Sequence, residues 1–135
     1  MGWKKHFYPV VILERYLDSF GHMNNAAYLD LFEQARWDWI TQGGFGLEKI
    51  KARHMGPVLL EVNLKFKREL KLRTKITIES QIAHYETKIA EIHQNMIGED
   101  GTLHCAAVFQ VGFFNTQTRK LIQPPEEWLI AVGKT

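Results

Sequence analysis

The stretch YLDSFGHMNNAAYLDLFEQAR, residues 16–36, joins two segments of different character. The first half is polar and irregular, with one acid, one histidine and two asparagines. In the second half, apolar side chains recur at positions 28, 31, 32, 35 and 39, which places them on one face of a helix. Asparagine is well suited to cap the start of such a helix, and the GGFG segment at 43–46 to end it. The pattern predicts one amphipathic helix over residues 25–41.

Other segments have the composition of β-strands, because they are rich in β-branched and aromatic residues. The expected strands cover residues 7–16, 57–70, 71–85, 87–98 and 102–114. The last of these is the most apolar, which predicts a central position in a sheet. GEDG at 98–101 is typical of a hairpin turn, and the segment between the helix and Arg53 is expected to be a loop. A final helical turn is expected after Pro125.

This order of elements, a strand, one long helix and then four strands, indicates an α+β fold. We expect an antiparallel sheet of about five strands wrapped around one long central helix, in a single domain over residues 1–135. One helix covers only one face of such a sheet. Apolar side chains left on other surfaces and edges therefore predict self-association, as a homodimer or homotetramer.

Composition excludes several functional classes. The chain is 45% hydrophobic and 24% charged with a net charge of +2, which is globular and argues against strong nucleic-acid binding. Cys105 is the only cysteine, so no intramolecular disulfide forms, and a reducing, cytoplasmic setting is expected. No segment has the length or apolarity of a signal peptide or spanning helix, so no membrane partner is expected. The six histidines have no metal-ligand spacing, so we expect no metal and no cofactor.

The opening stretch resembles the signature of hotdog-fold acyl-CoA thioesterases, in the 4-hydroxybenzoyl-CoA thioesterase-like family. The matching positions are Asp18, Gly21, His22, Asn24, Asn25, Tyr28, Leu29, Phe32, Glu33, Ala35 and Arg36. Met23 replaces the usual valine, and Tyr16 stands where many members carry a second aspartate. The element order also agrees with a hotdog fold over nearly the full length.

The resemblance implies an acyl-CoA thioesterase that hydrolyses a thioester to a free acid and CoA. In this family the aspartate that matches Asp18 attacks the thioester carbonyl or activates a water, and the helix N-terminus faces the carbonyl oxygen. Elementary electrostatics agrees, because free N–H groups and the dipole at a helix start stabilise developing negative charge. We therefore expect catalytic roles for Asp18, His22 and Asn25.

Each of these residues also has an ordinary structural explanation. Asp18 fits an Asx turn, His22 a loop-fixing hydrogen bond, and the two asparagines a helix cap. Glu33, two turns into the helix, is a reserve catalytic candidate, since a helical acid is catalytic in another branch of the superfamily. Residues expected to bind substrate are Asn24, Tyr28, Gly56, Lys65, Lys67, Arg68 and Arg73.

The basic run KFKRELKLRTK, residues 65–75, allows two interpretations. It is either a solvated strand face and turn, or a surface that binds the phosphates of coenzyme A. Two alternative functions also stay open. One is a non-catalytic acyl-CoA-binding hotdog module, and the other is a hotdog hydratase or dehydratase that acts on acyl thioesters.

Overall fold

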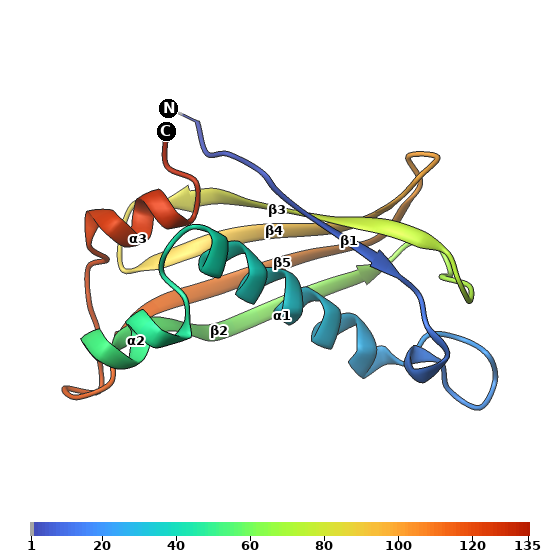
Figure 1. The fold of residues 1–135 in the computed structure, drawn as a ribbon, viewed down its shortest axis with the longest axis horizontal. Helices are drawn as coiled ribbons and strands as arrows, with labels where there is room; N and C mark the ends of the chain where they lie inside the picture. The colour runs from blue at the N-terminus through green and yellow to red at the C-terminus, as the bar shows by residue number, and fades with distance from the viewer. Residues whose placement is uncertain (1) are drawn as a thin grey trace.

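The computed structural model describes residues 2–135 and contains one long helix, α1, enclosed by a curled antiparallel sheet (Figure 1). The elements in chain order are β1 (His6–Val11), a 3-10 helix (Glu14–Tyr16), α1 (Asn25–Gln42), α2 (Leu47–Arg53), β2 (Met55–Phe66), β3 (Lys75–Tyr85), β4 (Ile89–Gly98), β5 (Leu103–Asn115), β6 (Lys120–Leu121) and α3 (Glu126–Ala131). The expected architecture, about five strands around one helix, is confirmed.

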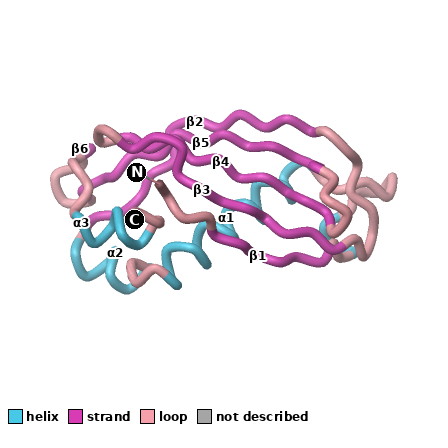
Figure 2. Tube along the Cα trace, turned by 90° about the horizontal axis from the view of Figure 1, so that it is seen from above, coloured by secondary structure: helices cyan, strands magenta, loops and turns pink. Residues whose placement is uncertain are grey.

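The sheet has the strand order β1-β3-β4-β5-β2, with the two-residue β6 paired to β5. Figure 2 shows the strands side by side with α1 beneath them. The prediction that residues 102–114 form the central strand is wrong, because β4 is the middle strand and β5 lies between β4 and β2. The apolar composition of β5 instead reflects its cover, since α1 packs on its inner face and α3 near its end.

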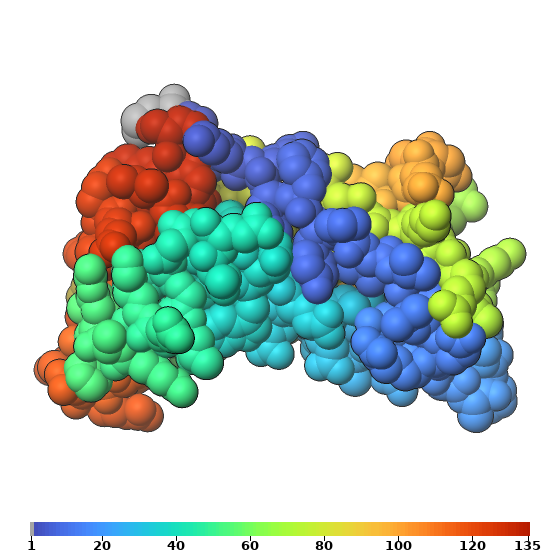
Figure 3. All heavy atoms as spheres, in the orientation of Figure 1, coloured from blue at the N-terminus to red at the C-terminus, as the bar shows by residue number. Residues whose placement is uncertain are grey.

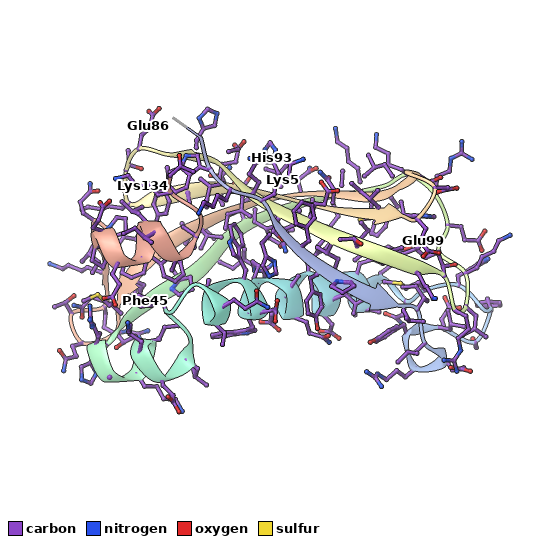
Figure 4. The ribbon with its side chains drawn as sticks, turned by 45° about the horizontal axis from the view of Figure 1, so that its top comes forward. Lys5, Phe45, Glu86, His93, Glu99 and Lys134 are labelled. Atoms are coloured by element: carbon purple, nitrogen blue, oxygen red, sulfur yellow. The ribbon has the colours of Figure 1, made fainter. Side chains whose placement is uncertain are left out.

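The core lies between α1 and the inner face of the sheet. The predicted stripe of α1 is buried, and Phe32 packs edge-on against Phe109 of β5 with ring centroids 5.9 Å apart. Every second residue of β3, β4 and β5 is buried, as expected for strands with one covered face. Figure 4 shows side chains filling this space, with His93 of β4 on the opposite face.

Several boundaries differ from the sequence-based expectation. The segment before Arg53, predicted to be a loop, forms the helix α2. This helix ends at His54, which takes the left-handed conformation (φ 56°), and its Ile50 packs on Gly56 of β2. β2 ends at Phe66, and residues 67–74 turn back toward β3. β1 ends at Val11, where Ile12 N–H donates to Thr74 O (2.9 Å).

The connections gather at the two ends of the molecule. The β1–α1, β2–β3 and β4–β5 connections lie at one end, on the right in Figure 1. Helices α2 and α3 and both chain termini lie at the other end. In Figure 1, α1 starts and β2 ends at the right-hand end of the molecule. The polar stretch before α1 therefore lies at the same end as the basic run, residues 65–75.

Candidate active site

Asp18 lies in a tight loop that is closed by backbone pairing between Leu17 and Met23. Asp18 N–H donates to His22 O (2.7 Å), and Asp18 Oδ1 accepts the N–H groups of Phe20 (2.9 Å) and His22 (3.1 Å). Gly21 supplies the positive φ (81°) that the turn requires. One carboxylate oxygen therefore organises the loop, as an Asx turn does, while the side chain as a whole stays exposed.

The start of α1 follows this loop directly. Asn24 is the N-cap, and its Oδ1 accepts the N–H of Ala26 (2.8 Å). The N–H of Ala27 donates to Asn24 O (2.9 Å). Among residues 2–135 no acceptor is bonded to the backbone N–H of Asn25. That free donor at the positive end of the helix dipole is the group able to stabilise an oxyanion.

His22 and Tyr28 bring two further elements to this loop. His22 Nε2 lies 2.9 Å from Glu69 Oε1, in an exposed contact that ties the loop to the β2–β3 connection. Tyr28 is buried and packs edge-on against Phe66 at the end of β2, with ring centroids 4.9 Å apart. Burial is the main cause of the raised pKa of Tyr28, and electrostatic interactions with Cys105 and Glu69 add to it.

A polar network crosses the core farther along α1. Arg36 Nη1 donates to Gln94 Oε1 (2.9 Å), and its guanidinium lies 4.4 Å from the centre of the Phe109 ring. Gln94 is fully buried and also donates to Phe32 O (3.1 Å) and Ser80 Oγ (2.9 Å). Burial lowers the pKa of Arg36, and Glu33 partly opposes that shift.

A cavity of about 130 Å³ opens beside Arg36, between α1, the start of β2 and α3. Its walls are mostly apolar and include Trp37, Pro57, Leu59 and Trp128. Glu33, the reserve catalytic candidate, lines the same cavity and is exposed. The volume is close to that of a cavity that accepts one benzene ring, so a small apolar group fits.

The structure brings only some of the expected substrate-binding residues close to Asp18. Lys65, Lys67 and Arg68 are exposed at the end of β2, on the same end of the molecule. Arg73 forms an ion pair with Glu14, in which its Nη2 donates to both carboxylate oxygens (2.7 and 2.8 Å). Gly56 lies at the other end of β2, about 33 Å from Phe66 by strand rise. Its Cα lies against Ile50, since an added Cβ would approach Ile50 Cγ2 to 2.9 Å.

The family model of the thioesterase-like superfamily matches residues 12–132. The chain belongs to this superfamily. The resemblance found in residues 16–36 is thereby confirmed.

Individual proteins are also similar to this chain. The long-chain acyl-CoA thioesterase FadM of Escherichia coli is 30% identical over 79 residues, which cover 58% of this chain and 59% of that protein. A hypothetical protein from Staphylococcus aureus, solved in complex with CoA, has a TM-score of 0.89 at 21% identity, covering 98% of this chain and 84% of that one. The probable thioesterase YbaW of Escherichia coli has a TM-score of 0.85 at 24% identity, covering 96% and 99%. The hotdog fold is thus confirmed.

Two features of this thioesterase-like chain were not predicted from its sequence. The Arg36–Gln94–Ser80 network was not expected, although Arg36 follows Tyr28 and Phe32 at helical spacing and so continues a buried stripe. The cavity beside it depends on contacts between α1, β2 and α3, for which no local pattern exists. Within residues 2–135, no three His, Cys, Asp or Glu side chains are grouped to hold a metal ion. None of the helices there is both long and apolar enough to cross a bilayer.

Proposed function

We propose that this protein is an acyl-CoA thioesterase, in which Asp18 acts as nucleophile or general base. The observation that carries the proposal is the placement of an exposed carboxylate on the loop leading into α1, whose first N–H, that of Asn25, has no bonded acceptor in residues 2–135. Superfamily membership supports thioester chemistry for this arrangement.

The chemistry needs two groups, and each has a candidate. The carboxylate of Asp18 either attacks the thioester carbonyl carbon or removes a proton from an attacking water. The carbonyl oxygen becomes an oxyanion, which the Asn25 N–H and the helix dipole stabilise. Collapse of the intermediate expels the CoA thiolate. Direct attack leaves an acyl-aspartyl anhydride that a water then cleaves, whereas the base route yields the free acid at once.

We propose further that the working unit is a homodimer or a dimer of dimers, paired through β2. Both sheet edges are unpaired in one copy, but β1 carries Pro9 at its middle and is unsuited to pairing. β2 offers a longer edge beside an exposed apolar surface, formed by Leu29, Trp37, Leu59, Val62 and Phe66. Two copies related by a twofold axis would bury this surface.

Such pairing also explains why the expected site is spread over the length of β2. In an antiparallel pair of β2 edges, the start of one strand lies beside the end of the other. Gly56 and the cavity near Pro57 would then lie close to the helix start of the partner subunit. The acyl group would enter that cavity, and the site would be complete only in the dimer.

The substrate end is proposed from charge and from the relatives. Lys65, Lys67 and Arg68 are exposed at the end of the molecule where α1 starts and would bind the phosphates of CoA. Arg73, which is ion-paired with Glu14, would contribute a further guanidinium to the same site. FadM acts on long-chain acyl-CoA, and we propose an acyl-CoA with an apolar acyl group here. We propose a reducing, cytoplasmic compartment, in which the buried thiol of Cys105 would remain free.

One observation favours the non-catalytic alternative. Asp18 Oδ1 already accepts two backbone N–H groups, so a role that is purely structural would account for that oxygen. In that case the fold would bind acyl-CoA without cleaving it.

A thiol-release assay separates the two functions. The protein is incubated with acetyl-, octanoyl-, palmitoyl- and benzoyl-CoA, and free CoA is followed with a thiol reagent while binding is measured by calorimetry. We expect release of free thiol that matches the free acid formed. Binding of one or more of these thioesters without any thiol release would establish the binding module instead.

A further inference from the structure

At the Asp18 end of the molecule, the β1–α1 and β2–β3 connections and the start of β5 are bonded to one another. Arg73 N–H donates to Ile12 O (2.7 Å), which holds the β2–β3 connection against the end of β1. Lys67 N–H donates to His104 O (2.9 Å), which holds it against β5. With the His22–Glu69 contact, the Asp18 loop joins the same surface. In Figure 3 the atoms of these segments cover the right-hand end of the molecule.

Large apolar side chains protrude from this end. Phe20, at the tip of the Asp18 loop, is 84% exposed, the highest value among the large apolar residues. Leu72 in the β2–β3 connection is 43% exposed, and Val11, which pairs with Lys75 in the sheet, is 38% exposed. The loop around Phe20 is held by Asp18 and Gly21, so a defined turn presents the phenyl ring to solvent. Loop tips are normally polar, so these side chains indicate a binding surface.

Cations are concentrated at the same end of the molecule, in the β2–β3 connection and the strand ends that flank it. Residues 65–75 contain six cations and one acid, a net charge of +5, while the whole chain carries +2, so all other residues together carry −3. Among residues 2–135, no carboxylate lies within 4 Å of Lys71 or Lys75. Two acids of this end are already paired, Glu14 with Arg73 and Glu69 with His22. Acids of this end that form no ion pair among residues 2–135 include Asp18, in the loop that carries Phe20, and Glu99 and Asp100, on the β4–β5 hairpin.

We propose that this end docks on the surface of an anionic lipid bilayer, through Val11, Phe20, Lys71, Leu72 and Lys75, which we call the docking end. Exposed aromatic and aliphatic side chains among unpaired lysines are the combination that binds anionic headgroups and inserts into the acyl boundary. CoA phosphates alone would leave the three apolar side chains without a partner. Nucleic acid would require aromatic side chains that alternate with the cations, and residues 65–75 contain one aromatic residue, Phe66.

The docking end also contains the loop of Asp18. A long-chain acyl-CoA is amphipathic and partitions into membranes, so docking would place the proposed site where such a thioester is concentrated. The proposal goes beyond thioester hydrolysis and does not depend on it, because binding to vesicles is measured without turnover.

Vesicle sedimentation tests the proposal with the full chain. We expect binding to vesicles of phosphatidylcholine with about one third phosphatidylglycerol, little binding to phosphatidylcholine alone, and loss of binding at high salt. Lys71→Glu with Lys75→Glu should weaken binding at least about 25-fold, at about fivefold per cation removed. Phe20→Ser with Leu72→Ser should weaken it about tenfold or more. Circular dichroism checks that each variant is folded.

Matched controls lie at the β3–β4 connection, at the opposite end of the subunit and two strands away from the β2 edge. Lys88→Glu and Ile89→Ser make the same kinds of change at exposed positions and should leave vesicle binding unchanged. Equal binding to neutral and anionic vesicles, no binding to either, or equal losses in these controls would overturn the proposal. The proposal would also be overturned if the docking-end variants bound vesicles normally while free CoA displaced the wild-type protein. That result would assign the cations to the nucleotide alone.

Discussion

At the scale of single residues, Asp18 and Asn24 both bond backbone N–H groups, yet they do different work. Asn24 uses its side-chain oxygen to cap α1. Asp18 uses Oδ1 to hold its loop, and the structure gives Oδ2 no partner among residues 2–135. A residue needed only for the turn would tolerate an amide in place of the carboxylate, because the amide oxygen accepts the same bonds. The two roles are therefore separable by substitution.

Asp18→Asn should keep the fold and the affinity for acyl-CoA but lower kcat by at least about 10²-fold, because an amide neither attacks the thioester nor accepts a proton. Glu33→Gln is the matched control, since it removes a carboxylate from the cavity wall with the same change of size. Steady-state kinetics and thermal unfolding measure both variants. The assignment is falsified if Asp18→Asn retains activity within a few-fold of wild type while Glu33→Gln is inactive.

Asn24→Ala should lower the free energy of unfolding by about 1 kcal/mol, because the N–H of Ala26 loses its acceptor. Asn25→Ala is the control, as the Asn25 side chain forms no hydrogen bond within residues 2–135. Urea unfolding followed by circular dichroism measures both. Equal losses in the two variants would show that the capping bond is not the source of the stability.

At the scale of elements, the end of β2 and the interior of β5 differ in exposure. β2 is an edge strand whose last residues are in solvent, whereas alternate residues of β5 are buried. Charges on the end of β2 are therefore free to meet a ligand. A nucleophile inside β5, such as the thiol of Cys105, is inaccessible to thiol reagents and to a substrate.

Lys65→Glu with Lys67→Glu should raise KM for acyl-CoA more than it lowers kcat, because CoA phosphates lie far from the reacting carbonyl. KM for short acyl-pantetheine esters, which lack the nucleotide, should change little. Lys88→Glu, at the exposed β3–β4 connection, serves as the control. Equal effects on CoA and pantetheine esters would remove the phosphate assignment.

Burial raises the pKa of the Cys105 thiol to about 11, so only about one molecule in a thousand is thiolate at pH 8. We expect an aromatic disulfide reagent at pH 8 to label no thiol in the native protein and one thiol per chain in denaturant. Absorbance of the released chromophore gives the count. Rapid labelling of the native protein would show that β5 opens or that the thiol reaches solvent.

At the scale of the whole molecule, the sheet has two unequal edges and one surface that α1 leaves uncovered. Val62 and Phe66 of β2 pair with the buried Phe109 and Cys105 of β5, so they point to the inner face, yet they are 39% and 55% exposed. An inner face that remains in water beside an unpaired edge is a surface that a second copy can bury.

Val62→Glu should therefore lower the dimer affinity at least about tenfold, because a buried charge without a partner opposes association. Phe7→Glu, at an exposed apolar position on the β1 edge, should leave the affinity unchanged. Sedimentation at micromolar concentration distinguishes dimer from monomer. A wild-type monomer at these concentrations would contradict the proposed interface and the shared site.

Much of this protein follows from local patterns in its sequence. The helix over 25–41 was predicted within one residue at its end, because a 3.6-residue period and an asparagine cap act over a few neighbouring residues. The hairpin at 98–101 and the alternation of β3 and β4 are local in the same sense. The motif at 16–36 identified the superfamily before any contact was known.

Tertiary structure decided what depends on contacts between distant segments. Strand order placed β4 rather than β5 in the middle, because pairing joins residues far apart in the chain. Packing buried Arg36 against Gln94, 58 residues away, and opened the cavity beside it. The length of β2 separated Gly56 from the Asp18 loop, and the fold left Phe20 in solvent at the end that carries the basic run. Sequence periodicity reports the faces of elements, whereas exposure and site assembly are set by which faces the folded chain brings together.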